Sequence, residues 1–396
     1  MITFKEAYDK VLSHPLDLGT EVVSLLNSSG RILAEDIKAD RDFPPFNRAT
    51  KDGIAIQYKV LESGASKFRI ESVASAGMPQ QELKDANSCL EVMTGAVLPT
   101  NTDTVIMYEH LSIKDGWATV NEEVENGQNI HYKGSDEIKG ATLVKEGKKI
   151  GPAEIGVMAS VGESMVHVKA LPMVCTISTG NELVDIEIKP KPHQIRKSNS
   201  VTLQVALSNL GLKPTTMHLK DDKNAIENGL QKALKENDVL LLSGGVSKGK
   251  FDFIPEMMED LGVEKIFHRV AQRPGKPFWF GVHKTLQTII FSFPGNPVST
   301  FANYHLYFLP WLCTSWNVPI KRQSVRLNSS FRVMPPLTRF IQVQTEWKEG
   351  VMYATPVVEN GSGDLTSLVK SDGFICLEPR ETVYEIEELV RFIGTR

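Results

Sequence analysis

Residues 239–252 read Val239-Leu240-Leu241-Leu242-Ser243-Gly244-Gly245-Val246-Ser247-Lys248-Gly249-Lys250-Phe251-Asp252. This stretch is the strongest indication of the fold class. An apolar run that ends in glycines is typical of a strand buried inside a sheet. Glycine lets a ligand approach the backbone closely, and a neighbouring lysine supplies charge for phosphate. Taken alone, Lys248 and Lys250 of this turn are expected to face solvent rather than to bind a ligand.

Two similar turns follow along the chain. Arg273-Pro274-Gly275-Lys276-Pro277 comes after the apolar run 265–270, and Pro294-Gly295-Asn296-Pro297 comes after the run 288–293. Turns that leave the strands of an α/β sheet gather at one edge, where such folds bind ligands. Each turn alone is equally consistent with an ordinary tight turn or, at Asn296-Pro297, with a simple helix start whose free N–H groups could bind an anion. Together, the three turns predict a site for a phosphorylated small molecule.

Strands and helices alternate around this stretch, which predicts an α/β domain with a mainly parallel sheet. The predicted strands are residues 173–177, 215–219, 239–242, 265–270 and 288–293. The predicted helices are residues 201–210, 224–235, 254–261 and one that begins at Pro297. Ser198, Asn199 or Ser200 is expected to cap the first of these helices.

The flanking segments predict three further domains. Helical spacing at Phe4-Ala7-Tyr8-Val11 and again after Gly151-Pro152 suggests that two distant helices pack together, with a strand at Arg31 to Ile37. Residues 42–134 are rich in strands and turns. The tail returns to short strands at residues 324–327, 340–345, 352–356 and 374–377, which favours a small β-barrel or sandwich. The predicted division is a split N-terminal domain (1–41 and 139–168), a β-rich insert (42–138), the α/β domain (169–318) and a C-terminal β-barrel (319–396).

The overall composition fits a soluble multidomain protein of the cytoplasm. The 396 residues are 41% hydrophobic and 23% charged with a net charge of −4, so neither a nucleic-acid partner nor a membrane is expected. The N-terminus lacks the apolar segment of a signal peptide, and the apolar stretch 304–316 is too short to span a bilayer. The four cysteines are far apart and are expected to be reduced.

Acidic residues follow the same predicted strands. Glu182 comes soon after strand 173–177, Asp221-Asp222 follow strand 215–219, and Asp252 follows strand 239–242. Carboxylates beside phosphate-binding turns suit Mg²⁺, which bridges a few carboxylate oxygens to substrate phosphates. Asp222 and Asp252 could equally cap the helices that follow them, and the two roles are compatible.

Six motifs together resemble the molybdopterin molybdenumtransferases, the MoeA family, to which the E domain of gephyrin also belongs. They occur in the family's order and cover nearly the whole chain: Asp42-Phe43-Pro44-Pro45-Phe46 through Asp52-Gly53, Met93-Thr94-Gly95-Ala96-Val97-Leu98-Pro99, Ser178-Thr179-Gly180-Asn181-Glu182-Leu183, Gly244 to Asp252, Pro274-Gly275-Lys276-Pro277, and Pro294-Gly295-Asn296-Pro297-Val298-Ser299. The resemblance implies an elongated homodimer whose cleft lies between the α/β domain of one subunit and the β domains of its partner. Spacing alone favours ordinary turns at the first two motifs.

The resemblance also implies an activity: adenylylated molybdopterin and molybdate react, with Mg²⁺, to insert the metal and release AMP, and an adenylyltransferase is a possible partner. The implied catalytic residues are Asp52, Glu182, Asp222, Asp252 and Lys276. The implied substrate-binding residues are Thr94, Asp136, Ser178, Gly244, Gly245, Ser247, Arg273, Gly275, Pro294, Asn296, Pro297 and Ser362. Glu182, Asp222 and Asp252 are the implied metal ligands.

The chemistry agrees with this assignment. A phosphoanhydride carries several negative charges, so Mg²⁺, Lys276, Arg273 and the helix start at Asn296-Pro297 would stabilise charge on the AMP leaving group. The oxyanion itself attacks, and catalysis then rests on positioning and electrostatics without an enzyme nucleophile.

Several positions depart from the family pattern. Asn47 and Asn181 replace carboxylates, while Arg48, Lys51 and Lys248 add positive charge, which favours the anion over the metal in the cleft. These changes leave open a second hypothesis, a catalytically weak paralogue that binds the pterin nucleotide or a partner protein as a scaffold. A third, a nucleotidyl transferase or amidohydrolase built on the α/β domain alone, would need neither the β-rich insert nor the tail.

Overall fold

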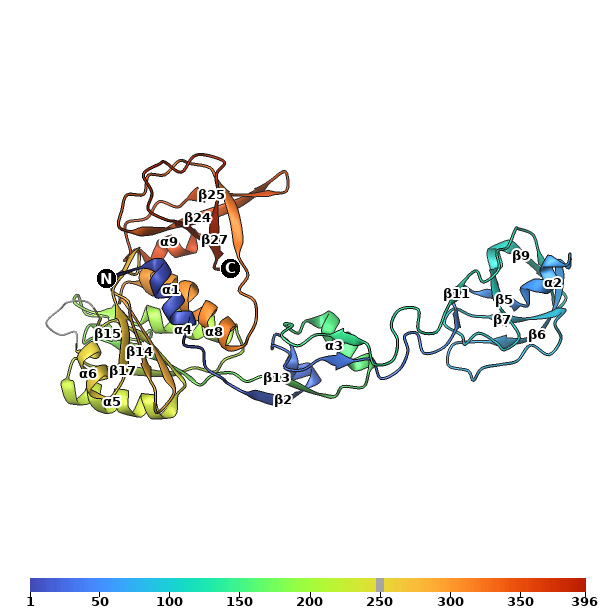
Figure 1. The fold of residues 1–396 in the computed structure, drawn as a ribbon, viewed down its shortest axis with the longest axis horizontal. Helices are drawn as coiled ribbons and strands as arrows, with labels where there is room; N and C mark the ends of the chain where they lie inside the picture. The colour runs from blue at the N-terminus through green and yellow to red at the C-terminus, as the bar shows by residue number, and fades with distance from the viewer. Residues whose placement is uncertain (247–252) are drawn as a thin grey trace.

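The computed structural model describes residues 1–246 and 253–396 and has three lobes in a row (Figure 1). The large lobe holds both chain ends, the α/β domain and the C-terminal barrel. A small lobe follows, and a third lobe lies at the far end of the molecule. No helix in the described ranges is both long and apolar enough to cross a membrane.

The α/β domain has a six-stranded sheet in the order β17-β14-β18-β22-β21-β19. Four neighbouring strands are parallel: β17 (Thr215–Leu219), β14 (Val174–Thr179), β18 (Val239–Ser243) and β22 (Thr288–Phe293). Next to β22, β21 (Trp279–His283) runs antiparallel to the other strands, and the edge strand β19 (Glu264–His268) pairs antiparallel with β21. Every residue of β14, β18 and β22 is buried, as their continuous apolar character requires. The predicted mainly parallel sheet is confirmed.

Helices cover both faces of this sheet, because separate hydrophobic clusters form on its two sides. They are α4 (Ser198–Ser208), α5 (Lys223–Glu236), α6 (Ile254–Asp260), α7 (Pro297–Asn303) and α8 (Leu309–Ser315), with a π-helical segment at Tyr304–Phe308 between the last two. Asp222 caps α5 by accepting a hydrogen bond from the Ala225 N–H at 2.9 Å, as predicted. The predicted cap of α4 is wrong: Lys197 occupies the N-cap position, and no side chain caps the helix.

The N-terminal helix α1 (Phe4–Leu12) packs against the large lobe. The Phe4 ring lies 5.8 Å from that of Tyr307 and 4.9 Å from that of Phe340, centroid to centroid. Strand β1 (Ile2–Thr3) also pairs there, with β20 (Val270–Arg273). The expectation that α1 packs against the second helix, α3 (Pro152–Ser160), is therefore wrong. Aromatic partners in the large lobe bury its apolar face instead.

The small lobe is built from two distant segments. One hydrophobic cluster joins residues 23–37 to residues 143–168. Its elements are β2 (Thr20–Ser24) paired with β13 (Met165–Lys169), β3 (Ile37–Lys38) paired with β12 (Thr142–Val144), a 3₁₀ turn at Leu25–Ser28, and α3. The predicted strand at residues 31–37 is wrong, because only isolated bridges at Ile32 and Leu33 precede β3.

The far lobe is the predicted β-rich insert. Its six-stranded sheet has the order β8-β5-β7-β6-β10-β9. The strands are β5 (Gly53–Ile56), β6 (Lys67–Ala74), β7 (Ser88–Val92), β8 (Thr104–Met107), β9 (Leu111–Lys114) and β10 (Trp117–Val120). A separate pair, β4 (Arg48–Ala49) with β11 (Ile130–His131), lies beside this sheet, together with the short helix α2 (Tyr58–Glu62) and a 3₁₀ turn at Tyr108–His110.

The tail forms the predicted closed barrel. Its strands are β23 (Gln323–Leu327), β24 (Thr338–Lys348), β25 (Val351–Pro356), β26 (Gly373–Leu377) and β27 (Leu389–Gly394), and pairing of β24 with β26 closes it. The helix α9 (Leu365–Val369) lies between β25 and β26. Residues 265–270, predicted as one strand, divide at Arg269, whose φ is 72°. Strand β19 stays in the α/β sheet, whereas β20 pairs with β24 of the barrel.

Candidate active site

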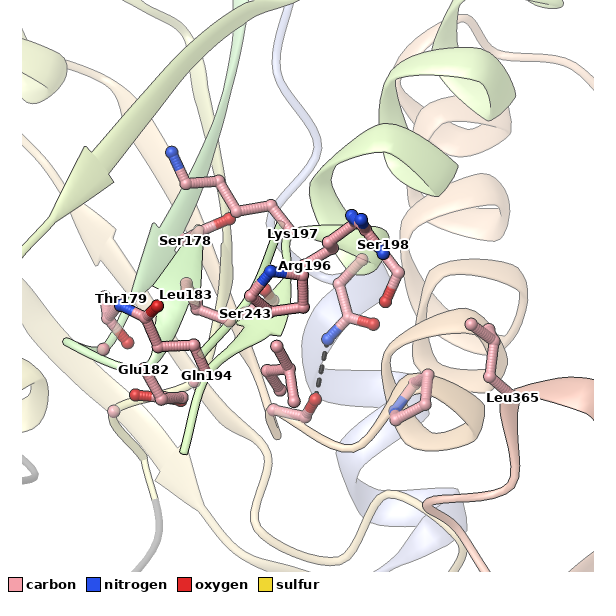
Figure 2. Close-up of a pocket in the computed structure, with 18 of the residues that line it drawn as sticks. Ser178, Thr179, Glu182, Leu183, Gln194, Arg196, Lys197, Ser198, Ser243 and Leu365 are labelled. Carbon is pink, nitrogen blue, oxygen red and sulfur yellow. Dashed lines mark hydrogen bonds between the residues drawn. The ribbon is translucent and has the colours of Figure 1, made fainter. Parts of the chain in front are cut away.

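A cavity of about 700 Å³ opens at the carboxyl ends of β14, β18 and β22, where the sequence predicts the site (Figure 2). The wall is formed by the connection between β14 and β15 (Leu183–Val184), the turns after β18 and β22, the start of α4 and the loop before α9. Of the predicted site residues, those that line it are Ser178, Glu182, Gly244, Gly245 and Pro297. Ser247, Lys248 and Asp252 lie outside the described residues.

Glycine backbone lines one side of the cavity. Gly244 has a φ of 100°, and a Cβ atom there would lie 2.7 Å from the Thr179 hydroxyl oxygen. Gly245 has a φ of 71°, and its Cβ would lie 2.6 Å from Ile254. Only glycine fits these positions, so the turn brings bare backbone to the cavity surface. The Gly244 N–H is donated to the Phe293 carbonyl at 3.0 Å, so of the two amides that of Gly245 can bind an anion.

Carboxylates lie at the opposite turn, after β14. The Glu182 carboxylate folds over Gly180, since a Cβ on Gly180 would lie 2.3 Å from it. Asn181 and Asp221 tie two loops together, because each side-chain oxygen accepts the other's backbone N–H, at 3.1 and 3.2 Å. Asp221 lines the cavity, whereas Asp222 is used in capping α5. Among the candidate carboxylates, Glu182 and Asp221 are therefore the two that the described structure brings to the cavity.

Sequence reasoning missed the basic wall of the cavity. Arg196 and Lys197 line it just before α4. Arg196 ends strand β16 (Ile195–Arg196), which pairs with β15 (Leu183–Val184), and Lys197 is the next residue. The Lys197 ammonium forms an ion pair with Asp185 at 2.7 Å. The four cations Lys189, Lys191, Arg196 and Lys197 lie close together in the sequence, and this clustering could have indicated a basic wall. The cavity consequently combines the Gly245 amide, the carboxylates of Glu182 and Asp221, and the cations Arg196 and Lys197, a set that suits a polyphosphate ester.

The third glycine turn connects the α/β domain to the barrel. The Asn296 amide donates to the Ser362 hydroxyl at 2.8 Å, and the Val298 N–H donates to the Ser362 carbonyl at 3.1 Å. Asn296 holds the N-cap position of α7, but its side chain makes no capping bond. Ser362, predicted to bind substrate, thus takes up one of the helix N–H groups that was expected to be available to an anion. Asn199 adds a bond to the Gly295 carbonyl at 2.7 Å.

The turn at Arg273 to Pro277 lies outside the lining of this cavity. A Cβ on Gly275 would lie 2.3 Å from the Asn303 side-chain oxygen, which fixes the turn against α7. Lys276 and Arg273 are exposed, and Arg273 lies opposite Arg339 on neighbouring strands. Burial and then the charge of Arg273 lower the pKa of Arg339, whose Nε has no hydrogen-bond partner among the described residues. Two adjacent guanidinium groups form a second place for an anion.

Three predicted site residues adjoin strands of the far lobe: Asp52 comes just before β5, Thr94 follows β7, and Asp136 follows β11. These strands lie well away from the α/β sheet in Figure 1. The Asp52 carboxylate accepts two hydrogen bonds from Thr94, from the N–H at 2.6 Å and from the hydroxyl at 2.7 Å. These bonds, the backbone one first, hold the pKa of Asp52 below its usual value, so its carboxylate is ionised at neutral pH. Asp136 accepts a hydrogen bond from His131 at 2.8 Å. One copy of the chain does not bring this group to the cavity.

Comparison with known proteins decides the family. Residues 2–162 match the model of the MoeA N-terminal region (domain I and II), residues 175–314 a probable molybdopterin binding domain, and residues 324–393 the MoeA C-terminal region (domain IV). The chain belongs to the MoeA family. The first match spans α1 and the two smaller lobes, the second the α/β domain, and the third the barrel.

Relatives match over the full length. A molybdopterin molybdenumtransferase of Synechocystis sp. is 39% identical over 99% of both chains, and one of Bacillus subtilis is 29% identical over 100% of this chain and 94% of the other. A solved MoeA structure from Pyrococcus horikosii superimposes with a TM-score of 0.84 at 30% identity, covering 100% of this chain and 99% of that one. The predicted multidomain fold is confirmed by this likeness.

Three departures from the MoeA pattern have visible roles. The Asn47 side-chain oxygen accepts a hydrogen bond from the Lys133 N–H at 2.8 Å. Asn181 forms the loop bridge to Asp221 described above. Arg48 donates to the His131 ring at 3.1 Å. Lys51 is exposed and has no hydrogen bond or ion pair within residues 1–246 and 253–396. The substitutions at 47, 48 and 181 therefore enter ordered contacts.

Proposed function

We propose that this chain inserts molybdate into adenylylated molybdopterin and releases AMP, as a transferase of molybdenum cofactor biosynthesis in the cytoplasm. The full-length likeness to molybdopterin molybdenumtransferases supports the reaction. The observation that carries it is the cavity itself. Its glycine turns, Glu182, Arg196 and Lys197 stand at the carboxyl ends of parallel strands, within the part that matches a molybdopterin-binding domain.

The phosphoanhydride of the substrate fits the cavity. The Gly245 N–H, together with Arg196 and Lys197, would neutralise its oxygens. Holding these charges before reaction stabilises the negative charge that develops on the departing AMP. The oxyanion attacks the anhydride, so the protein contributes position and electrostatics.

The cavity offers Mg²⁺ two carboxylates but no complete set of protein ligands among the described residues. In residues 1–246 and 253–396, no three His, Cys, Asp or Glu side chains are grouped closely enough to form a metal site. Mg²⁺ commonly takes one or two carboxylates plus substrate phosphates, and Glu182 with Asp221 supplies such a pair at the cavity. When bound, the ion would neutralise phosphate charge.

Molybdate is a small dianion, and the Arg273–Arg339 pair with nearby Lys276 is suited to it. The two arginines face each other across β20 and β24, and neither has a carboxylate within ion-pair distance among the described residues. An anion would relieve their repulsion and satisfy the buried Nε of Arg339. We propose that this pair binds the incoming oxyanion.

A homodimer would complete the site. Asp52, Thr94 and Asp136 lie in the far lobe of the same chain, so we propose that a second copy brings its far lobe to the cavity. A docked molybdopterin adenylyltransferase could supply the substrate directly. The alternative function is a scaffold that binds the nucleotide without turning it over. A measurement of AMP release distinguishes the two functions.

The test is AMP release from adenylylated molybdopterin by the purified chain, with and without molybdate, tungstate and Mg²⁺. Glu182→Gln should lower kcat by about 100-fold, because it removes a charge from the cavity. Glu227→Gln is the matched control, since Glu227 is exposed on α5 and does not line the cavity. Wild-type turnover by Glu182→Gln would reject the assigned site, and nucleotide binding without any turnover would favour the scaffold.

A further inference from the structure

A chain of hydrogen bonds in the far lobe ends at Asp136. An Arg48 Nη donates to Nδ1 of His131 at 3.1 Å, and Nε2 of His131 lies 2.8 Å from the Asp136 carboxylate. A guanidinium can only donate, so Nδ1 must accept. The remaining ring proton then sits on Nε2 and is donated to Asp136. Arg48 thereby selects one tautomer of His131, the one that can hold Asp136.

The backbone presents these residues to one another. Arg48 and His131 are opposite partners in the β4–β11 pair. The Asp136 N–H is bonded to the Phe43 carbonyl at 2.9 Å, independently of the three side chains. Removing the side-chain contacts would free the Asp136 carboxylate but leave its loop anchored. His131 has 28% of its side chain exposed and Asp136 has 53%, so the carboxylate is open to a ligand while the imidazole is largely enclosed.

The same short strand also supports Asp52 and Thr94. The Ala49 N–H donates to the Ala96 carbonyl at 3.0 Å, and the Gly95 N–H donates to the Ala49 carbonyl at 2.9 Å. Arg48 therefore lies between the Thr94–Asp52 contact on one side and Asp136 on the other.

We propose that Arg48 and His131 are positioning residues, which orient Asp136 toward the substrate by fixing the Nε2–H tautomer of His131. This rests on the proposed function, in which Asp136 binds the pterin nucleotide from a partner copy. Arg48, a departure from the family pattern, is then part of the binding surface that this chain uses.

The first test is independent of activity. Long-range ¹H–¹⁵N spectra of the full chain labelled at histidine report the tautomer of each ring, and loss of one signal in His131→Leu assigns His131. We expect the Nε2–H tautomer at neutral pH, and conversion toward Nδ1–H or imidazolium in Arg48→Met. An imidazolium or an Nδ1–H ring in the wild type would overturn the proposal.

The second test measures KM for adenylylated molybdopterin. Arg48→Met and His131→Leu should each raise KM by about tenfold, and the double variant should raise it no further, because both break the same chain. His131→Gln should stay within about threefold of the wild type, since its amide offers one acceptor and one donor.

Lys51→Met is the matched control for charge. It removes one positive charge from the same lobe but breaks no contact in the described structure. Equal KM values for Arg48→Met and Lys51→Met would show that charge alone matters and would overturn the positioning role. If the wild type releases no AMP, the proposed function fails, and the spectra still decide the tautomer.

Discussion

Among single residues, the imidazole of His305 has buried nitrogens, and this makes the stability of the fold depend on pH. Its ring lies 4.5 Å from that of Phe301 and 5.1 Å from that of Tyr304, centroid to centroid. Neither ring nitrogen has a hydrogen-bond partner in the described part of the chain, and both are buried. Burial lowers the pKa of His305 to about 3. The folded protein therefore keeps this imidazole neutral in mild acid.

This predicts an acid-sensitive stability. The unfolded imidazole takes up a proton near its ordinary pKa of about 6.5, whereas the folded one does not until about pH 3, so the unfolded state binds more protons between these values. The free energy of unfolding should fall by about 1 kcal/mol per pH unit below pH 6. His305→Phe should remove this part of the slope in urea titrations at pH 5 and pH 7.5. His193→Gln, at an exposed position, is the control, and an unchanged slope in His305→Phe would contradict the assignment.

The candidate site was predictable where its residues directly follow a buried strand. Gly244 follows β18 at once, and Glu182 comes three residues after β14, so the carboxyl ends of the strands place both. Arg196 comes at the end of a connection without regular periodicity. Arg196 reaches the cavity because β16 pairs with β15, and the residues around Arg196 in the sequence do not indicate this pairing. Asp221 and Asp222 are adjacent in the sequence, and only the geometry of the α5 cap shows which one turns toward the cavity.

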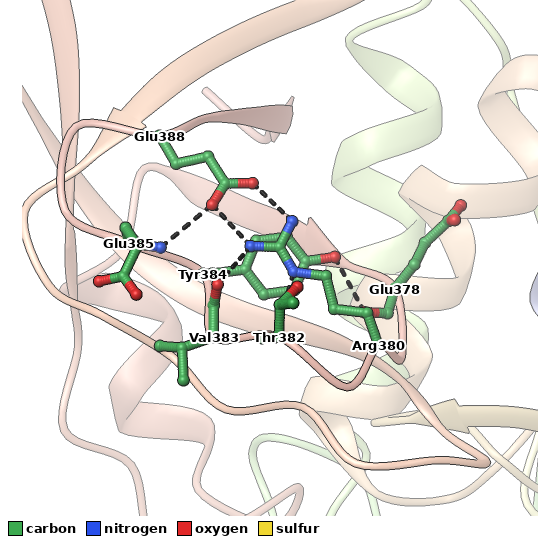
Figure 3. Close-up of polar contacts among 7 residues, drawn as sticks. All are labelled: Glu378, Arg380, Thr382, Val383, Tyr384, Glu385 and Glu388. Atoms are coloured by element: carbon green, nitrogen blue, oxygen red, sulfur yellow. Dashed lines mark hydrogen bonds and ion pairs between the residues drawn. The ribbon is translucent and has the colours of Figure 1, made fainter.

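Among the secondary-structure elements, the β26–β27 connection is held by one arginine (Figure 3). Arg380 donates two hydrogen bonds to the Glu388 carboxylate, at 2.7 and 2.6 Å, and another to the Val383 carbonyl at 2.6 Å. Its guanidinium carbon lies 3.4 Å from the centroid of the Tyr384 ring, whose hydroxyl donates to the Glu378 carbonyl. A single side chain thus closes the loop that returns the last strand to the barrel.

Removing Arg380 should destabilise the barrel. Arg380→Met is expected to lower the free energy of unfolding by about 2 kcal/mol, because it leaves a partly buried carboxylate and a carbonyl without their donor. Hydrogen bonds from Arg380 hold the pKa of Glu388 below its usual value. The contribution should then be complete above about pH 4.3 and be lost as the pH falls through the lower folded pKa. Urea unfolding of Arg380→Met against Arg332→Met, an exposed arginine of the same barrel, measures it, and equal stabilities would refute the role.

Elements were predictable where local pattern and tertiary environment agree. The strands at 215–219 and 288–293 have the predicted bounds. The second is a continuous apolar run that is buried throughout, and the first is an edge strand in which Leu219 is the buried residue. The division of residues 265–273 into two strands was not predictable from the sequence. Residues before Arg269 pair with the α/β sheet and residues after it pair with the barrel, and the chain turns between them with a positive φ at Arg269. The place of α1 is similar: its apolar spacing indicates a helix, but its aromatic partners lie some 300 residues away in sequence.

At the scale of the whole molecule, the extended shape separates the two groups of candidate residues. The cavity with Glu182 lies in the large lobe, and Asp52 with Thr94 lies in the far lobe, with the small lobe between them (Figure 1). A chain of this shape cannot close its own site by local loop movement. A symmetric dimer in which each copy's far lobe reaches the other's cavity would form two complete sites.

Mixing two inactive variants tests this arrangement. In a mixed dimer of Asp52→Asn and Glu182→Gln subunits, one site carries both substitutions and the other carries neither. Free subunit exchange should therefore restore about a quarter of wild-type AMP release, because half of the dimers are mixed and half of their sites are intact. Glu182→Gln mixed with Asp221→Asn is the control, since both residues line the cavity of one chain and every site then keeps one defect. Recovery in the control, or none in the first mixture despite a dimer by light scattering, would show that each chain completes its own site.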